Sequence, residues 1–402
     1  MDFSRRSFVR ALGWTGLGTV AATLRPAGVD ALTRTAAQGA PPIAPSIAAP
    51  RSPASALGSF IKIDSNENPY GVGPSVAEAV QQALALAGRY PRNRDTLTDA
   101  LARLHGVPPP SILLGCGSGE LLRAATLAFT SRTRAAVVPS PTFETCGETA
   151  SRLGYPVREV RVDASLRLDL DAMRQAAAGA GLVYICNPNN PTGTVRSARD
   201  IEQFIEYVLG ATPDAAVLVD EAYHEFVDDP SYATAIPLAI RSPRVIVTRT
   251  FSKIYGMAGL RVGYAIGHPD ALAAMEQHMP FGTMSVLSVA AALAALHDTK
   301  RLTEQQQANR ETRLATRKLF EDAGYRVAAS DANFLMVDVR QRASDFRGAC
   351  RAHGVLVGRP FPPLDTHARI TIGTKDEMQR AADAFRRVLG IASAAAAPAA
   401  AA

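Results

Sequence analysis

A lysine near the middle of the chain is surrounded by groups that suit an anionic ligand. Thr250, Ser252 and Lys253 follow a short apolar run, Val245 to Thr248, and Arg261 comes eight residues after the lysine among glycines. Hydroxyl groups, and a guanidinium that can bind two oxygens at once, suit a dianionic phosphate. A lysine that lies beside a bound phosphate and away from water can form an imine with an aldehyde. Taken alone, the segment is also compatible with a basic surface loop.

A second segment has an unusual composition. Residues Asn187 to Gly193 read Asn-Pro-Asn-Asn-Pro-Thr-Gly and follow another apolar run, Leu182 to Cys186. Two prolines and a glycine favour a rigid loop, in which the asparagines can present their amide groups at fixed positions. An ordinary turn is the alternative, but the length and composition of the segment favour a binding loop.

A carboxylate ends a third apolar run. Asp220 closes the run that begins at Ala216, and it opens the sequence Asp-Glu-Ala-Tyr, which ends at Tyr223. A carboxylate at the end of a buried strand needs a partner. A protonated pyridine nitrogen is one such partner, and the charge pair would keep the ring electron-withdrawing. Taken alone, the motif fits a helix N-cap or a surface ion pair equally well.

A fourth segment predicts an anion-binding turn. Gly115 to Glu120 reads Gly-Cys-Gly-Ser-Gly-Glu and lies between the run Ile112 to Leu114 and a helical pattern. Glycines and a serine at a helix N-terminus form a nest of N–H groups. The spacing matches neither the P-loop nor the dinucleotide-binding fingerprint, so we expect a site for one phosphate.

These segments must be positioned by a sheet, because each follows a short apolar run. The runs alternate with amphipathic segments, a rhythm typical of an α/β domain. Several runs lack polar alternation, as in a parallel sheet that is covered on both faces. Ligands bind at the carboxyl ends of the strands in such sheets. We expect strands at 112–114, 135–138, 182–186, 216–220, 245–248, 262–265, 333–338 and 370–372, and helices at 121–129, 201–209, 301–323 and 378–389, the last ending at Gly390.

Composition excludes several classes of function. The net charge of +6 over 402 residues is modest and forms no basic run, so no nucleic-acid partner is expected. The four cysteines include no C-x-x-C pair and no cluster with zinc spacing, so we predict no metal site. Such a cysteine-poor chain predicts no disulfide framework, although an oxidising compartment leaves room for one isolated bridge.

The two ends read as segments outside the fold. Arg5 and Arg6, followed by Phe8 and a weakly apolar stretch from Ala11 to Leu24, resemble a twin-arginine export signal. The alternative is a chance arginine pair in a disordered tail. The stretch is too short and too rich in Gly and Thr to be a stable membrane anchor. We therefore expect a periplasmic or other extracytoplasmic location, reached through the twin-arginine translocase.

Together, the four segments resemble the fold-type I pyridoxal-phosphate (PLP) aminotransferases, and most closely the histidinol-phosphate aminotransferase branch. The resemblance extends from about residue 60 to 390, and its motifs keep the family's order. They are found at 66–71, 89–91, 117–120, 141–143, 187–193, 220–223, 249–253, 259–264 and 369–373.

This resemblance implies the aspartate-aminotransferase fold. That is an α/β fold with a large PLP-binding domain, built on a mostly parallel seven-stranded sheet flanked by helices, and a smaller α+β domain. We predict a twin-arginine signal at 1–31, a disordered linker at 32–59, an N-terminal arm or small-domain segment at 60–90, the large domain at 91–295, the small domain at 296–391 and a disordered tail at 392–402.

The resemblance also implies how the cofactor is held. Lys253 matches the lysine that forms the Schiff base and later moves the proton between the substrate Cα and the cofactor C4′. Asp220 matches the carboxylate that pairs with the pyridinium nitrogen, and Asn190 and Tyr223 match the donors to the ring 3-oxygen. The phosphate ligands implied are Ser118, Gly119, Thr250, Ser252 and Arg261.

The substrate residues and a homodimer are implied in the same way. Arg369 matches the arginine that binds the substrate α-carboxylate, and Arg359 matches a second basic residue of the pocket. Asn190 also borders the substrate, and Tyr70 is expected near it. Tyr90 matches a tyrosine that reaches the cofactor phosphate from the neighbouring subunit, which implies a homodimer with shared sites.

One position departs from the family pattern. Family members often carry a ring-stacking aromatic residue three positions after Phe143, where this chain has Cys146. Either Phe143 stacks on the ring instead, or the ring is less covered. For Cys146 we expect apolar packing rather than a reactive thiol.

The reaction expected from these residues is transamination. An arginine that fixes the α-carboxylate favours loss of the Cα proton over loss of CO2, and the two half-reactions would alternate. A 2-oxo acid such as 2-oxoglutarate is the expected acceptor. Because histidine synthesis is cytoplasmic, export favours a donor other than histidinol phosphate. The alternatives are a PLP decarboxylase of the threonine-phosphate type and a non-catalytic periplasmic binding protein, and release of keto acid or of CO2 distinguishes the three.

Overall fold

The computed structural model describes residues 60–92, 94–280 and 284–391. The predicted signal at 1–31, the linker at 32–59 and the tail at 392–402 lie outside the described residues. The predicted division into segments at 60–90, 91–295 and 296–391 stays a prediction. No helix within the described ranges is both long enough and apolar enough to span a membrane.

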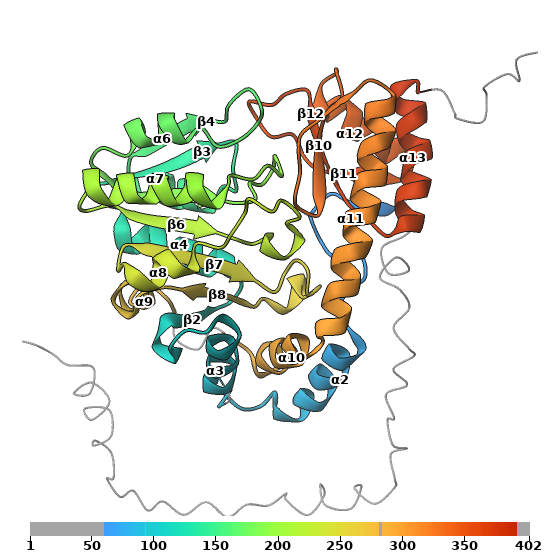
Figure 1. The fold of residues 1–402 in the computed structure, drawn as a ribbon. Helices are drawn as coiled ribbons and strands as arrows, with labels where there is room; N and C mark the ends of the chain where they lie inside the picture. Colours follow the sequence, from blue (N-terminus) through green and yellow to red (C-terminus); the bar gives the residue numbers. More distant parts are fainter. Residues whose placement is uncertain (1–59, 93, 281–283, 392–402) are drawn as a thin grey trace, which may run out of the picture. The chain divides into compact units, whose positions relative to one another are not determined.

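The chain alternates strands and helices through most of its described length (Figure 1). The strands are β1 (Ile61–Ile63), β2 (Ile112–Gly115), β3 (Ala135–Ser140), β4 (Val157–Arg161), β5 (Ala180–Cys186), β6 (Ala216–Asp220), β7 (Val245–Thr250), β8 (Gly263–Ile266), β9 (Arg326–Val327), β10 (Phe334–Asp338), β11 (Val355–Val357) and β12 (His367–Thr371).

The helices range in length from six residues in α8 to 24 in α11. They are α2 (Pro74–Ala83), α3 (Arg94–His105), α4 (Ser118–Phe129), α5 (Thr145–Arg152), α6 (Leu170–Ala176), α7 (Ala198–Ala211), α8 (Ile236–Arg241), α9 (Pro269–Glu276), α10 (Val286–His297), α11 (Thr299–Asp322), α12 (Ala343–Ala352) and α13 (Lys375–Leu389). Short 3₁₀ turns are η2 (Leu84–Leu86), η3 (Pro109–Ser111), η4 (His224–Phe226) and η5 (Ala258–Leu260).

Seven strands form one sheet in the order β2-β8-β7-β6-β5-β3-β4. Strands β7, β6, β5, β3 and β4 are parallel, whereas β8 is antiparallel to both β7 and β2. Strand β2 therefore runs in the same direction as β7, and the carboxyl ends of six strands share one edge of the sheet. The predicted mostly parallel seven-stranded sheet, flanked by helices, is confirmed.

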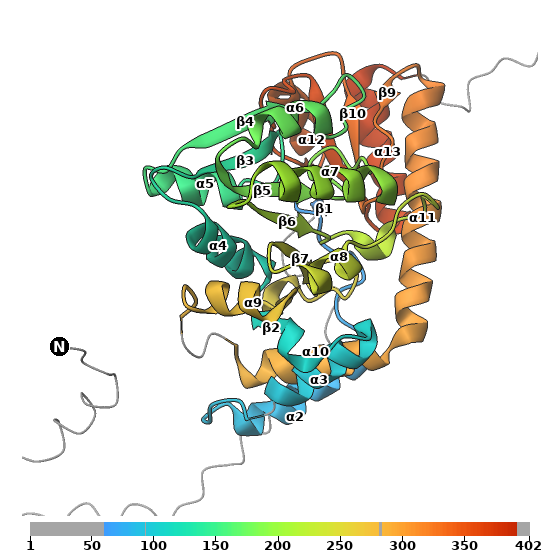
Figure 2. The ribbon, with the colours of Figure 1, turned by 60° about the vertical axis from the view of Figure 1, so that its left-hand side comes forward.

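The sheet is covered on both faces, because successive strand residues pack into two different cores. Val217 and Val219 of β6 belong to a core with α3, α6, α7, α8 and α10, whereas Ala216 and Leu218 belong to a core with α4, α5 and α9. Figure 2 shows α4 and α9 on one side of the strands and α7 and α8 on the other. Burial of both faces explains why these strands lack polar alternation.

A second sheet lies in the last third of the chain. Strands β12, β10 and β9 are antiparallel, and α11, α12 and α13 contribute Phe320, Phe346 and Phe385 to its core. Helix α13 begins with a capping box at Thr374 and ends at Gly390, whose φ of 66° supports the predicted C-terminal stop.

The beginning of the described chain pairs with its last quarter. Strand β1 is parallel to β11, with Ile61 opposite Val355 and Ile63 opposite Val357. This pairing places the residues directly after β1 beside the carboxyl edge of the large sheet, where they contact Tyr223 and Lys253.

The sequence predicted most of these elements but not all of them. Six of the seven strands of the large sheet were expected, and the structure mainly extends their ends, as at β7, which continues to Thr250. The missed strand is β4, which lies at the sheet edge and pairs only with β3. Its sequence, Val-Arg-Glu-Val-Arg, buries one residue of five, so it carries no apolar run.

Candidate active site

A cavity of about 390 Å³ opens at the carboxyl edge of the large sheet. All the predicted site residues except Tyr70 and Tyr90 line it, although they come from segments far apart in the chain. They are Ser118, Gly119, Phe143, Asn190, Asp220, Tyr223, Thr250, Ser252, Lys253, Arg261, Arg359 and Arg369.

One end of the cavity is a cluster of hydrogen-bond donors. Ser118 and Gly119 form the first turn of α4, where the N–H groups and the helix dipole favour an anion. Arg261 reaches the same place and donates to the hydroxyl of Ser252 across 3.4 Å. The hydroxyl of Thr250 lies 2.9 Å from that of Ser252. This donor set fits a phosphate group.

Gly117 makes room for this cluster. A Cβ at Gly117 would lie 2.1 Å from Nη2 of Arg261, and the residue has a φ of 77°, a conformation that favours glycine. Gly263 has a similar role, because a Cβ there would lie 2.2 Å from the main-chain nitrogen of Ser118. Both glycines let the arginine and the helix N-terminus approach each other.

Asp220 lies at another wall of the cavity, at the end of β6. Its carboxylate is buried and accepts hydrogen bonds from Tyr184 at 3.0 Å and from Thr248 at 3.2 Å. Burial raises its pKa to about 6, against the lowering effect of these hydrogen bonds. A buried carboxylate in this state favours a cationic partner, so the site fits a protonated ring nitrogen.

Lys253 follows β7 and lines the same cavity as Asp220. Its Nζ donates to the main-chain oxygen of Asn66 at 3.3 Å and lies 5.4 Å from the centre of the Tyr223 ring. Burial, followed by the positive charge of Arg369, lowers the pKa of the lysine to about 8. About a tenth of the amine is therefore uncharged and nucleophilic at pH 7, far more than for a lysine with its ordinary pKa of 10.5.

Tyr223 is held by a residue that the sequence did not single out. The side-chain amide of Asn66 donates to the Tyr223 hydroxyl at 3.1 Å, and its oxygen accepts from Thr371 at 2.9 Å. Asn66 is buried and has a φ of 54°, which asparagine tolerates better than most residues. Asn66 therefore contacts both Tyr223 and Lys253.

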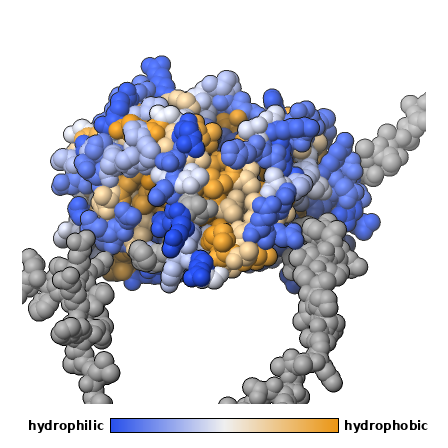
Figure 3. Space-filling view, turned by 90° about the horizontal axis from the view of Figure 1, so that it is seen from below, coloured by the Kyte–Doolittle hydropathy of each residue, from blue (hydrophilic) through white to orange (hydrophobic). Residues whose placement is uncertain are grey.

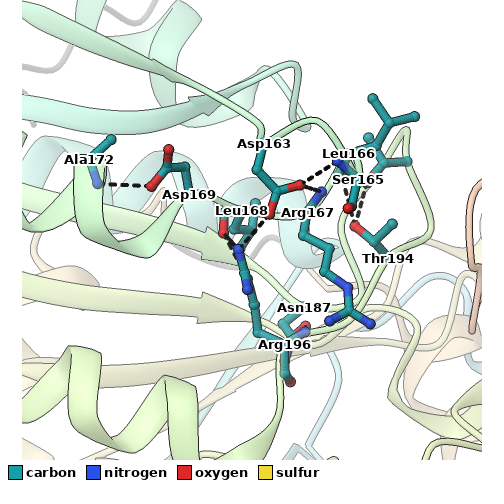
Figure 4. A network of polar contacts seen from close by, with 11 residues as sticks. Asp163, Ser165, Leu166, Arg167, Leu168, Asp169, Ala172, Asn187, Thr194 and Arg196 are labelled. Atoms are coloured by element: carbon teal, nitrogen blue, oxygen red, sulfur yellow. Dashed lines mark hydrogen bonds and ion pairs between the residues drawn. The ribbon is translucent and has the colours of Figure 1, made fainter.

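The loop that carries Asn190 is fixed by a network beneath it. Figure 4 shows Arg196 between Asp163 and Leu168, with its side chain bonded to the carboxylate at 2.9 Å and to the main-chain oxygen at 2.7 Å. The main chain of Arg196 in turn exchanges hydrogen bonds with the Asn187 side chain. These hydrogen bonds fix the first residue of the 187–193 loop, and the loop places Asn190 in the cavity wall.

Arg369 lies beside Asn190. It donates to the Asn190 side chain at 2.7 Å and to the main-chain oxygen of Asp64 at 2.8 Å. Its Nε is buried and has no hydrogen-bond partner among the described residues. Burial lowers its pKa to about 10, so the guanidinium stays charged at neutral pH. An arginine with unused hydrogen-bonding capacity in a cavity wall fits a carboxylate ligand.

These features, taken with the sequence, identify the family. Residues 59–385 match the family described as aminotransferase class I and II. The chain belongs to this aminotransferase family. Curated relatives include the histidinol-phosphate aminotransferase of Symbiobacterium thermophilum, 36% identical over 83% of this chain and 92% of that protein. Another is the aromatic amino acid aminotransferase of Mycobacterium avium, 36% identical over 79% of this chain and 88% of that protein.

A solved structure of the same family contains the cofactor. The histidinol-phosphate aminotransferase of Sinorhizobium meliloti, in complex with pyridoxal 5′-phosphate, is 30% identical and superposes with a TM-score of 0.75, over 82% of this chain and 90% of that one. The chain is therefore a PLP-dependent aminotransferase with the aspartate-aminotransferase fold. When bound, PLP supplies an electron-withdrawing ring that takes up the charge released at the substrate Cα.

The side chains of the aminotransferase fit this cofactor. The donor cluster at α4 would hold the phosphate, and Asp220 would keep the ring nitrogen protonated. Tyr223 and Asn190 would face the ring oxygen, and Lys253 has the reactive amine. Their roles remain those implied by the family resemblance, and the structure adds that one cavity contains all five groups.

The position of Cys146 follows from the packing of α5. Cys146 is fully buried in the core beneath α4, and burial raises the pKa of its thiol to about 12. Phe143, and not Cys146, lines the cavity. The expected apolar packing of this cysteine is therefore observed. All four cysteines of the chain are free, so no bridge joins them.

Tyr70 and Tyr90 lie away from this cavity. Tyr70 borders a separate small hollow with Asn68 and Ile254, and 40% of its surface is exposed. Tyr90 is 86% exposed. The single aminotransferase chain does not bring either tyrosine to Lys253, so their predicted roles stay predictions.

The cavity also contains residues that sequence reasoning missed. Asn66, Glu144 and Ala222 stand within or beside motifs that carried the resemblance, and Phe361 follows Arg359 by two residues. The sequence therefore marked their positions but not their contacts. Ser65, Cys186 and Ala258 are small and carried no chemical signal. The residues missed are Ser65, Asn66, Glu144, Cys186, Ala222, Ala258 and Phe361.

Proposed function

We propose that the protein is an exported homodimeric aminotransferase that moves the amino group of an α-amino acid to a 2-oxo acid such as 2-oxoglutarate. The observation that carries the proposal is the position of Arg369. This arginine lines the Lys253 cavity and has a buried Nε without a partner among the described residues. An α-carboxylate bound there would hold the substrate while Lys253 removes the Cα proton.

The donor that best fits is an amino acid that carries its own α-carboxylate. Phe143 and Phe361 line the cavity and offer apolar contacts to a side chain. Histidinol phosphate is the second candidate, because a curated relative acts on it and Arg359 lines the cavity. Export from the cytoplasm favours the first candidate, since the histidine pathway would remain behind.

The test is a panel of amino donors with 2-oxoglutarate, assayed on purified holoenzyme. We expect keto acid from at least one α-amino acid, little or no product from histidinol phosphate, and no turnover by Lys253→Ala. Release of CO2 instead of keto acid would indicate a decarboxylase. Product formation by Lys253→Ala would contradict the catalytic assignment.

The export proposal rests on Arg5 and Arg6 and the weakly apolar stretch that follows them. Replacement of both arginines by lysine keeps the charge and removes the twin-arginine pair. We expect the native chain in the periplasmic fraction and the double variant in the cytoplasm. Equal distribution of the two would contradict the proposal.

The homodimer proposal is supported by exposed apolar residues at one face. Leu84, Leu86 and Leu104 are each more than half exposed, and Tyr90 is 86% exposed. Figure 3 shows hydrophobic residues interrupting the polar surface of the face at the bottom of Figure 1, where α2, α3 and α10 lie. A second copy would cover such residues.

Mixed subunits test whether the sites are shared. Lys253→Ala and Tyr90→Ala are expected to be weakly active or inactive alone. If Tyr90 acts in the partner's site, half of a random mixture carries one intact site, and activity should return to about a quarter of the native value. If the subunits exchange and the mixture stays inactive, Tyr90 does not act in the partner's site, which would contradict the proposal of shared sites.

A further inference from the structure

Two residues that line the active-site cavity form an ion pair with each other. Arg359 and Glu144 both line it, and the Nη2 of Arg359 pairs with Oε1 of Glu144. The two side chains are 49% and 38% exposed, so substrate can reach both. Neither charge is used in the cofactor contacts described above.

The two residues come from segments that lie far apart in the chain. Glu144 directly precedes α5, and its main-chain oxygen accepts from the nitrogen of Glu148 at 2.8 Å. Arg359 follows β11, and it donates to the main-chain oxygen of Pro360 at 3.0 Å. Its guanidinium also lies 4.3 Å from the centre of the Phe361 ring. The arginine is therefore held in place, with Glu144 as its counter-ion.

The pair lies where the Lys253 cavity meets a second hollow of about 470 Å³. Both spaces are lined by Phe143, Glu144, Arg359 and Phe361. A substrate side chain that extends away from the Arg369 carboxylate site toward this junction would meet the ion pair. The second hollow is also lined by Glu148, Arg152 and Glu159.

We propose that Glu144 determines substrate specificity by competing with anionic substrate groups for Arg359. The proposal rests on the function proposed above and deepens it. A substrate whose side chain ends in a carboxylate or a phosphate binds Arg359 only after Glu144 has been displaced. A neutral side chain leaves the ion pair intact. Substrates with neutral side chains therefore bind without this cost, whereas phosphates and dicarboxylates, including the acceptor 2-oxoglutarate, bind more weakly than they would without Glu144.

The direct test measures binding without turnover. Glutarate and butyrate carry the same first carboxylate, but only glutarate has a second one. Calorimetric titration of the PLP-loaded enzyme should show that Glu144→Gln tightens glutarate binding about fivefold, as expected for removal of a partly exposed competitor. Butyrate binding should stay the same.

Two further variants test whether the effect is specific to Glu144 and whether it depends on Arg359. Glu148→Gln is the matched control, because Glu148 lines the adjoining hollow but pairs with Arg152 at 2.9 Å. It should leave both affinities unchanged. Arg359→Gln should weaken glutarate binding and remove the effect of Glu144→Gln in the double variant.

The outcomes separate this proposal from the proposed function. Unchanged or weaker glutarate binding in Glu144→Gln would overturn the proposal. An equal gain in Glu148→Gln would also overturn it, because the gain would then follow from loss of any nearby negative charge. Neither outcome affects transamination of monocarboxylate substrates by the native enzyme. Failure of that reaction would instead overturn the proposed function.

Discussion

The Nζ of Lys253 donates a hydrogen bond to the main-chain oxygen of Asn66 at 3.3 Å, although the two residues lie 187 positions apart. The same asparagine donates from its side chain to the hydroxyl of Tyr223 at 3.1 Å. The segment after β1 therefore orients two groups of the active site. This role depends on a backbone with a φ of 54°.

Substitution of Asn66 should impair both stability and turnover. Asn66→Ala removes the partner of Tyr223 and Thr371 and places alanine at positive φ, so we expect a loss of about 2–3 kcal/mol in the free energy of unfolding. Turnover should fall about tenfold or more, because Tyr223 loses its hydrogen-bond partner. Denaturant unfolding and kcat measure the two effects.

Asn66→Gly separates the causes. Glycine accepts the positive φ but lacks the side chain, so stability should partly return whereas kcat stays low. Full recovery of kcat in Asn66→Gly would show that the side chain does not position Tyr223.

Gly117 should be intolerant of a side chain. Gly117→Ala would force Arg261 away from the N-terminus of α4, because the new Cβ would lie 2.1 Å from Nη2. We expect PLP affinity to fall about tenfold or more, since a charge-assisted hydrogen bond to the phosphate is lost. Equilibrium titration of the apoenzyme with PLP measures this.

Gly119→Ala is the matched comparison in the same turn. A Cβ at Gly119 would meet nothing within 4 Å, and the main-chain N–H remains. Its loss of PLP affinity should be clearly smaller than that of Gly117→Ala. Equal losses would show that the crowding of Arg261 is not the cause.

Asp220 should destabilise the apoenzyme at neutral pH. Its pKa is raised by burial from 3.8 to about 6, so the folded state binds the proton more tightly than the unfolded state. Relative to the ionised state, the protonated carboxyl therefore stabilises the fold fully below about pH 4. This contribution to the free energy of unfolding is lost as pH rises through about 6. At pH 8 the apo form of Asp220→Asn should be more stable than native apoenzyme by up to about 3 kcal/mol.

The difference should shrink by about half at pH 5, where the native carboxyl is largely protonated. Denaturant unfolding of both apo forms at pH 8 and pH 5 tests this, with PLP affinity expected to be lower in the variant. A variant less stable than native apoenzyme at pH 8 would contradict the assigned charge penalty.

The depressed pKa of Lys253 predicts how the apoenzyme captures its cofactor. Only the uncharged amine condenses with an aldehyde, so the capture rate should rise with pH around a midpoint near 8 rather than 10.5. Arg369→Gln removes a nearby positive charge and should move the midpoint to higher pH. Stopped-flow absorbance measures the rate, and a midpoint that moves lower in the variant would contradict the electrostatic cause.

The four chemical segments of the sequence converge in the structure because each follows a strand of one sheet. Lys253, Asp220 and Asn190 could be predicted, since apolar runs place them at a common edge and their types fit one ligand. Strand β4 could not, because its exposed edge position removes the apolar pattern.

Other residues depend on contacts that local sequence does not encode. Asn66 acts through Thr371, 305 positions away, and through a backbone conformation with no local signature. In the sequence, Glu144 cannot be distinguished from an ordinary surface acid. Its pairing with Arg359, which follows β11, is visible only in the structure. Tyr90 is exposed and does not line the cavity of its own chain, so a single chain gives it no role there.

Of the five lysines of the chain, all within the described residues, Lys253 lines the cavity. Borohydride reduction of the holoenzyme, followed by peptide mass spectrometry, locates the covalently held cofactor. We predict a single reduced pyridoxyl modification, on Lys253, that is absent from Lys253→Ala. Stoichiometric modification of Lys62, Lys300, Lys318 or Lys375 instead would contradict the account.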